Sequence, residues 1–143
     1  MKRSPFLFLA AALLLASACT NPVEKTFGEV MAVHDSAMGH MLEIERMMKA
    51  LEAEQKTLAA DSAADPARAA AVQEAHQALK TGYDGMMTWM KKFRNPDART
   101  PKGEAVAYLE QELVKVRKVQ QDIDSGLRQA RPLLPAGWDA AQP

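Results

Sequence analysis

Apolar and weakly polar residues alternate at steps of four and three between residues 30 and 58, and this repeat constrains the fold more than any other feature. The residues of this first seam are Val30, His34, Ala37, Met41, Ile44, Met48, Leu51, Gln55 and Leu58. Because an α-helix has about 3.6 residues per turn, this spacing keeps all of them on one face. The sequence therefore predicts a long first helix over residues 22–60 that packs against a partner.

Two later segments carry the same spacing and predict helices over residues 66–94 and 101–131. Gly82 and Gly85 lie inside the first of them, where each glycine weakens a helix by about 1 kcal/mol relative to alanine. The second seam consists of Ala69, Val72, His76, Leu79, Tyr83, Met86, Met90 and Phe93. The third seam consists of Val106, Leu109, Leu113, Val116, Gln120, Ile123, Leu127 and Ala130.

Short polar segments at residues 61–65 and 95–100 separate the three predicted helices. Asn21 and Thr100 each precede a proline, and we expect them to cap the first and third helices. Short connections between helices of similar length favour antiparallel neighbours. The sequence thus predicts an all-α fold, an antiparallel three-helix bundle.

This bundle occupies residues 22–131, and a dimeric coiled coil is the alternative. A tail follows over residues 132–143. Its large apolar residues are expected to fold back over the end of the bundle. They are Leu133, Leu134 and Trp138.

The first residues carry the marks of an export signal. Two basic residues, Lys2 and Arg3, precede an apolar run over residues 6–15, which is too short to span a bilayer permanently. Small residues then lead to the only cysteine in the order Ala16-Ser17-Ala18-Cys19, where the sequence resembles a bacterial lipobox. We therefore predict a cleaved lipoprotein signal peptide over residues 1–18.

The lipobox resemblance implies that Cys19 carries a diacylglycerol and an acylated amine, joined to the bundle by a tether at residues 19–21. Two or three acyl chains anchor a protein firmly, whereas one binds only marginally. Thr20 is not acidic, which in Gram-negative lipoproteins goes with the periplasmic side of the outer membrane; the inner membrane is the alternative. Cleavage by ordinary signal peptidase after Ala18, and an intermolecular disulfide through Cys19, also stay open.

A histidine and several methionines lie close together in the predicted hairpin. His34, Met38 and Met41 are spaced i, i+4 and i+7, so that one helix would present all three. Folding the chain back near residue 63 puts His34 level with Phe93. The residues that then face it are Met86, Met87, Trp89 and Met90.

We expect no cofactor. The alternative is a soft ion, Cu(I) or Ag(I), because thioethers together with imidazole suit such ions. The competing interpretation is packing alone, because methionine is an adaptable core residue. The candidate metal ligands are His34, Met38, Met41, Met86 and Met90.

Other metal and catalytic patterns are absent from the sequence. His34 and His40 are six residues apart and do not form a zinc pair, no Glu-x-x-His motif occurs, and no Cys-x-x-Cys-His motif would attach haem. Asp35 follows His34 directly, and because adjacent residues point apart on a helix we do not expect a side-chain contact. Without a nucleophile elbow or a Gly-rich phosphate loop, we expect a protein that is not an enzyme.

The charged residues argue against nucleic-acid binding and form one local basic cluster. The chain has 18 basic and 18 acidic residues, so it lacks the basic excess that is typical of a nucleic-acid-binding protein. Two interpretations of a local basic cluster stay open: contact with anionic lipid headgroups near Cys19, or compensation of the helix dipole by Lys91, Lys92 and Arg94 at the C-terminus of the second predicted helix. The basic cluster consists of Lys91, Lys92, Arg94, Arg99 and Lys102.

Three segments of the chain resemble a group of small helical envelope lipoproteins of Gram-negative bacteria. The segments are His34-Asp35-x-x-Met38, Met86-Met87-Thr88-Trp89-Met90 and Ala107-Tyr108-Leu109-Glu110. The resemblance covers most of the mature chain and implies a lipid-anchored helical bundle in the periplasm. It carries over no catalytic or binding residues to this sequence. We therefore expect a structural or interaction module, with the membrane and an envelope protein or a second copy as partners. Soft-metal binding is the alternative function.

Overall fold

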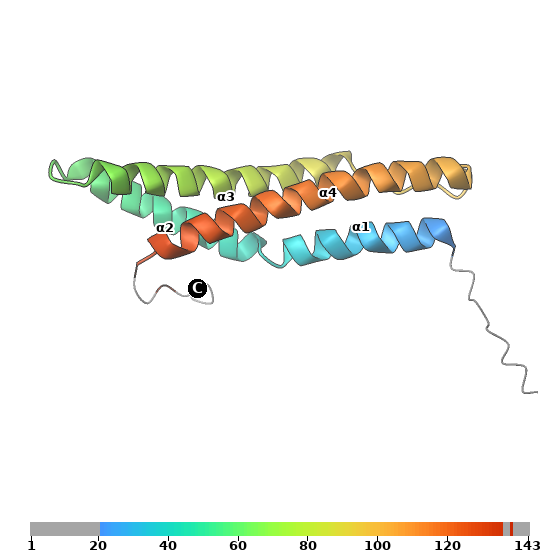
Figure 1. The fold of residues 1–143 in the computed structure, drawn as a ribbon, viewed down its shortest axis with the longest axis horizontal. Helices are drawn as coiled ribbons and strands as arrows, with labels where there is room; N and C mark the ends of the chain where they lie inside the picture. The colour runs from blue at the N-terminus through green and yellow to red at the C-terminus, as the bar shows by residue number, and fades with distance from the viewer. Residues whose placement is uncertain (1–20, 136–137, 139–143) are drawn as a thin grey trace, which may run out of the picture.

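The protein is all-helical in a computed structural model that describes residues 21–135 and 138 (Figure 1). The elements are α1 (Pro22–Met38), α2 (Met41–Ala60), α3 (Pro66–Lys92), α4 (Lys102–Ala130) and a short 3-10 helix, η1 (Arg131–Leu133). The predicted all-α bundle is confirmed: α1 and α2 together form the long first arm, and α3 and α4 form the second and third.

The helix starts follow from local capping chemistry. The side chain of Asn21 accepts a hydrogen bond from Val23 N at 3.2 Å, and that of Asp65 accepts one from Ala67 N at 2.9 Å. In both cases a proline takes the first helical position, where its missing N–H costs nothing. The expected cap at Thr100 is wrong, because α4 begins at Lys102 with Pro101 in the capping position and no side-chain cap bond.

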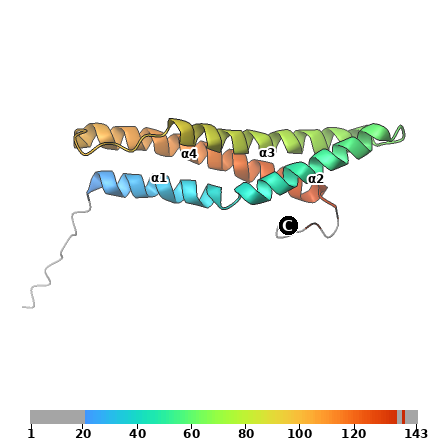
Figure 2. The ribbon, with the colours of Figure 1, turned by 180° about the vertical axis from the view of Figure 1, so that it is seen from behind.

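The first arm changes its partner along its length. α3 and α4 lie side by side and antiparallel, α1 lies along α4, and α2 turns away from α4 and lies along α3 (Figure 1). Seen from behind, α1 and α2 again meet at an angle (Figure 2). The arm therefore crosses from one neighbour to the other, although its seam continues without interruption.

The crossing takes place at Gly39 and His40. Glycine is the weakest helix former after proline, and here the hydrogen bond from His40 N reaches back only three residues, to Ala37 O at 3.0 Å. Such a 3-10 step tightens the backbone locally. His40 itself has φ −97° and ψ −8°, which lies between the helical and extended regions. This break separates α1 from α2.

The core is built largely from the three predicted seams, but α2 fully buries Met47 where the first seam placed Met48, which is only partly buried. Burying one such side chain fully contributes roughly 1.5–3 kcal/mol before entropy is counted. α3 is buried on a second face as well, through Ala75, Gly82 and Trp89, because it contacts both α2 and α4. The largest fully buried side chains are Val30, Ile44, Met47, Leu51, Val72, Leu79, Met86, Leu109, Val116 and Ile123.

Two glycines set the distance between α3 and α4. A Cβ atom built on Gly82 would lie 2.9 Å from the Cα atom of Ile123, and one built on Gly126 would lie 2.9 Å from the nitrogen of Leu79. Neither separation is compatible with a real side chain, so the two backbones approach each other closely only because both positions lack one. Gly85 is different, since its Cβ would meet Val119 at an ordinary 3.6 Å.

The bundle has two ends, which are formed by different connections of the chain. The start of α1 lies beside the connection between α3 and α4, and we call this the N-terminal end; the turn between α2 and α3 forms the opposite end (Figure 1). The predicted return of the tail is confirmed for the described residues, since Leu133, Leu134 and Trp138 pack against the core. Arg68 Nη2 also donates to Leu133 O at 2.6 Å.

Candidate functional site

The hairpin brings His34 of α1 against Met90 of α3. His34 Nε2 lies 3.3 Å from Met90 Sδ, and the imidazole side chain is 17% exposed. The sequence placed His34 level with Phe93, so the prediction is displaced by about one helical turn. Two of the five candidate metal ligands are thus in direct contact across the helix interface.

Asp35 contacts His34, and the expectation that it would not is wrong. Its Oδ1 atom lies 2.8 Å from His34 Nδ1. Adjacent Cβ atoms do point apart on a helix, but the imidazole and the carboxylate are long enough to curl toward each other at the surface. The two ring nitrogens of His34 therefore face a carboxylate oxygen and a thioether sulfur.

Aromatic side chains surround this contact. The ring centroids of His34 and Trp89 are 5.7 Å apart, and those of Trp89 and Phe93 are 4.9 Å apart. Phe93 also packs against Phe27 and Tyr108, with centroids 6.4 Å and 6.2 Å apart. The His34–Met90 contact therefore lies beside a predominantly apolar cluster rather than in open solvent.

Trp89 is fixed by the one buried carboxylate of the described core. Its Nε1 atom donates to Glu112 Oε2 at 2.8 Å, and Lys115 Nζ donates to Glu112 Oε1 at 2.6 Å. Glu112 is 5% exposed. The hydrogen bond from Lys115 to Glu112 raises the pKa of Lys115 above its ordinary value, because the carboxylate favours the ammonium form. No pattern in the sequence points to Glu112, which does not belong to the third seam.

The other candidate ligands belong more to the core than to the contact. Met86 is fully buried and Met41 is 8% exposed, and both pack within the central cluster. Met38 is only partly buried. Met41 begins α2, beyond the break, so His34, Met38 and Met41 are not carried by one continuous helix.

Carboxylate-rich metal sites are not formed by the described residues. Across residues 21–135 and 138, no group of three or more His, Cys, Asp or Glu side chains is arranged to hold an ion. The remaining histidines each face one glutamate: His76 Nε2 lies 3.1 Å from Glu52 Oε1, and His40 Nδ1 lies 3.3 Å from Glu43 Oε2. Among the three histidines, His34 is the one whose second nitrogen faces sulfur.

All five residues of the basic cluster are exposed, and they lie at the N-terminal end of the bundle. Arg94 Nη1 donates to Lys91 O at 2.8 Å and to Phe93 O at 2.7 Å, so that its guanidinium caps the end of α3. Arg99 pairs with Asp97 at 3.5 Å. The three lysines of the cluster, Lys91, Lys92 and Lys102, make no ion pair with any residue of the described chain.

A tyrosine ties α2 to α3 further along the bundle. Tyr83 Oη donates to Glu45 Oε1 at 2.7 Å. This hydrogen bond, with burial and the negative charge of Glu45, raises the pKa of Tyr83 above its ordinary value. The phenol therefore remains a neutral donor across the physiological range.

Cys19 lies outside the described residues, as does the predicted signal peptide. In the described part of the chain, none of the helices is sufficiently long and apolar to cross a membrane. Comparison with known proteins gave no match to a family model, to a curated protein or to a solved structure.

Proposed function

We propose that this chain is a lipid-anchored helical bundle of the bacterial envelope, held at the membrane through Cys19 and acting as a structural or interaction module without enzymatic activity. The observation that carries the proposal is the common location of two features. The start of α1 and the exposed basic cluster lie at the same end of the bundle (Figure 1).

The short tether would hold this end of the bundle close to the membrane surface. Three residues span at most about 10 Å when fully extended, so a lipidated Cys19 keeps Asn21 near the headgroups. Charges within about 8–10 Å of an anionic surface still feel its potential at physiological salt. Lys91, Lys92 and Lys102, which have no acidic partner in residues 21–135, are suited to that contact.

The shape then decides what such a module does. α4 has 29 residues and is roughly 44 Å long at 1.5 Å per residue. With the N-terminal end on the membrane, the turn between α2 and α3 projects away from the bilayer by about this length. An elongated bundle held in this way presents its opposite end to an envelope partner or to a second copy.

Replacement of the lipidated residue tests the anchor. Cys19→Ala is expected to move the protein from the membrane fraction to the soluble periplasmic fraction and to abolish incorporation of labelled fatty acid. Thr20→Asp is the matched variant, because it leaves the cysteine intact and should retain labelling while shifting the protein toward the inner membrane. Persistent membrane attachment of Cys19→Ala, with no labelled lipid in the parent chain, would refute the proposal.

A further inference from the structure

The contacts of His34 determine where its lone pair points. An ionised Asp35 carboxylate only accepts hydrogen bonds, so a neutral imidazole facing it at 2.8 Å carries its hydrogen on Nδ1. Nε2 then has no hydrogen and directs its lone pair toward Met90 Sδ, 3.3 Å away. Sulfur is also an acceptor, and two acceptors this close are stabilised when a cation lies between them.

The separation of the two acceptors fits joint coordination of one ion. With the metal–nitrogen and metal–sulfur distances of zinc sites as a guide, about 2.0 and about 2.3 Å, atoms 3.3 Å apart subtend an angle of about 100° at the ion. This angle is close to that of a tetrahedral or distorted trigonal site. The carboxylate on the other ring nitrogen is the usual outer partner of a metal-bound histidine, because it fixes both the tautomer and the ring orientation.

We propose that His34 Nε2 and Met90 Sδ bind a soft monovalent ion, Cu(I) or Ag(I), between α1 and α3, with Met38 Sδ as the third ligand. Imidazole and thioether are donors that soft ions accept, whereas Mg²⁺ and Ca²⁺ require oxygen. In the Nδ1–H tautomer the imidazole offers the ion its Nε2 lone pair.

Burial selects Met38 over Met86 as the third ligand. Each lies one helical turn from one of the contacting residues, Met38 four residues after His34 and Met86 four residues before Met90. Met86 is fully buried in the core, so moving its sulfur would disrupt packing. Met38 is only partly buried and can change rotamer at lower cost.

The neighbouring indole both protects the site and reports on it. Trp89 holds its ring 5.7 Å from that of His34 and is itself fixed through Glu112. A cation held at Nε2 is thus bound near an aromatic ring, which favours positive charge when the ion lies over the ring face. The chain has two tryptophans, so Trp138→Phe leaves Trp89 as the single tryptophan, which is excited selectively over the two tyrosines.

The experiment is a titration of the Trp138→Phe protein with Ag(I), followed by competition for Cu(I) against a chromophoric chelator. Every protein in the series also carries Cys19→Ser, because a free thiol would bind these ions more tightly than a thioether does. We expect one ion per chain and quenching of Trp89 fluorescence that saturates at one equivalent.

Isosteric substitutions assign the ligands. We expect His34→Gln and Met90→Leu each to weaken binding by roughly 100-fold or more, and loss of the outer partner in Asp35→Ala to weaken it by roughly tenfold. His76→Gln is the matched control, because His76 faces a carboxylate rather than a sulfur, and it should bind as the parent does. Circular dichroism of each variant confirms that the bundle is folded.

Two results would overturn the proposal. Equal affinity in the parent and in His34→Gln would show that His34 is not a ligand, and the contact with Met90 would then be packing alone. A loss in Met86→Leu with none in Met38→Leu would overturn the assignment of the third ligand. The anchor plays no part in this titration, so either result leaves the proposed lipid attachment untouched.

Discussion

At the scale of single residues, the structure assigns opposite tautomers to two histidines. His34 meets a carboxylate at Nδ1, whereas His76 meets one at Nε2. Because an ionised carboxylate can only accept, each ring should place its hydrogen on the nitrogen that faces the carboxylate. In long-range ¹H–¹⁵N correlation spectra at alkaline pH, we expect the Nδ1–H form for His34 and the Nε2–H form for His76.

Removal of each carboxylate is the control for this assignment. Asp35→Ala should return His34 toward the mixture of tautomers found in a free imidazole and leave His76 unchanged, and Glu52→Ala should do the reverse. An Nε2–H form of His34 in the parent protein would mean that its hydrogen points at Met90 as an ordinary donor. That result would remove the lone pair on which the proposed ion site depends.

Sequence reasoning predicted which helices supply the site better than it predicted individual contacts. The seams correctly set His34 against the end of the second predicted helix, because helical period and hairpin length suffice for that. The contact with Asp35 depends on side-chain rotamers, which no spacing rule contains. The hydrogen bond that Glu45 accepts from Tyr83 on the neighbouring helix likewise depends on side-chain rotamers.

At the scale of helices, alanine at Gly82 of α3 or at Gly126 of α4 should destabilise the bundle, although helix propensity alone favours alanine over glycine. Gly82→Ala should lower the free energy of unfolding by about 1–3 kcal/mol through overpacking against Ile123, although alanine is the better helix former. Gly28→Ala in α1 should instead raise it by roughly 0.5–1 kcal/mol, because nothing lies within 4 Å of the added Cβ. Urea unfolding followed by circular dichroism measures both.

This pair of substitutions separates packing from propensity, since both put the same methyl group inside a helix. If Gly82→Ala proved as stabilising as Gly28→Ala, α3 and α4 would lie farther apart than the structure places them. Gly85→Ala should give an intermediate result, because its Cβ meets Val119 at 3.6 Å. The sequence showed these glycines only as weak points, since close approach depends on the partner backbone.

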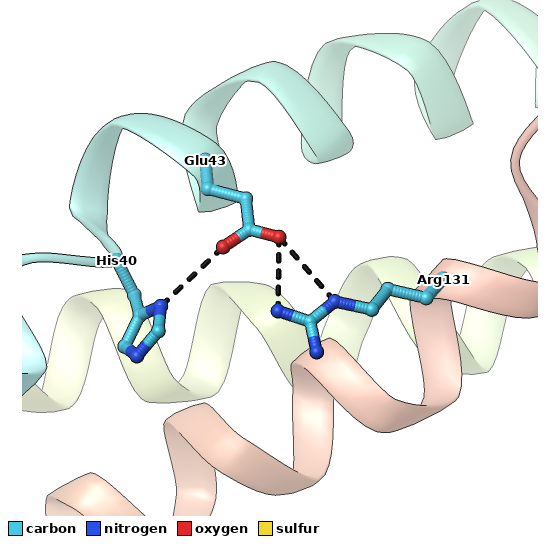
Figure 3. A network of polar contacts seen from close by, with 3 residues as sticks. All are labelled: His40, Glu43 and Arg131. Carbon is cyan, nitrogen blue, oxygen red and sulfur yellow. Dashed lines mark hydrogen bonds and ion pairs between the residues drawn. The ribbon is translucent and has the colours of Figure 1, made fainter. Parts of the chain in front are cut away.

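The break between α1 and α2 is held by a polar network that joins distant parts of the chain. Glu43, at the start of α2, accepts hydrogen bonds from Arg131 Nη2 at 3.0 Å and from Nε at 3.3 Å, and its other oxygen faces His40 (Figure 3). Gln120 of α4 donates to Ser36 Oγ at 3.2 Å on the other side of the break. Contacts from α4 on one side and from η1 on the other thus fix the two sides of the bend.

At the scale of the whole molecule, the three seams predicted the number, length and order of the bundle's arms. They did not predict that the first arm leaves α4 for α3. A four-three repeat states which face of a helix is buried, but it does not state against which of two neighbours, and the same seam serves both. The change of partner arises from Gly39 and from the network around Glu43, which lie outside the seam.

The position of the basic cluster, rather than the charge of the protein, should control its contact with a membrane. In unlipidated protein carrying Cys19→Ser, changing all five residues of the basic cluster to Gln should weaken binding to anionic vesicles at low salt by at least roughly tenfold, since each cation near the surface contributes about 1 kcal/mol. These residues are Lys91, Lys92, Arg94, Arg99 and Lys102.

The matched variant removes five exposed basic residues away from this end: Lys49, Lys56, Lys80, Lys118 and Arg128. Both variants have the same net charge, so cosedimentation with vesicles isolates location. Equal losses in both would show attraction without orientation. No loss in either would leave Lys91, Lys92 and Arg94 as cations that compensate the dipole at the C-terminal end of α3.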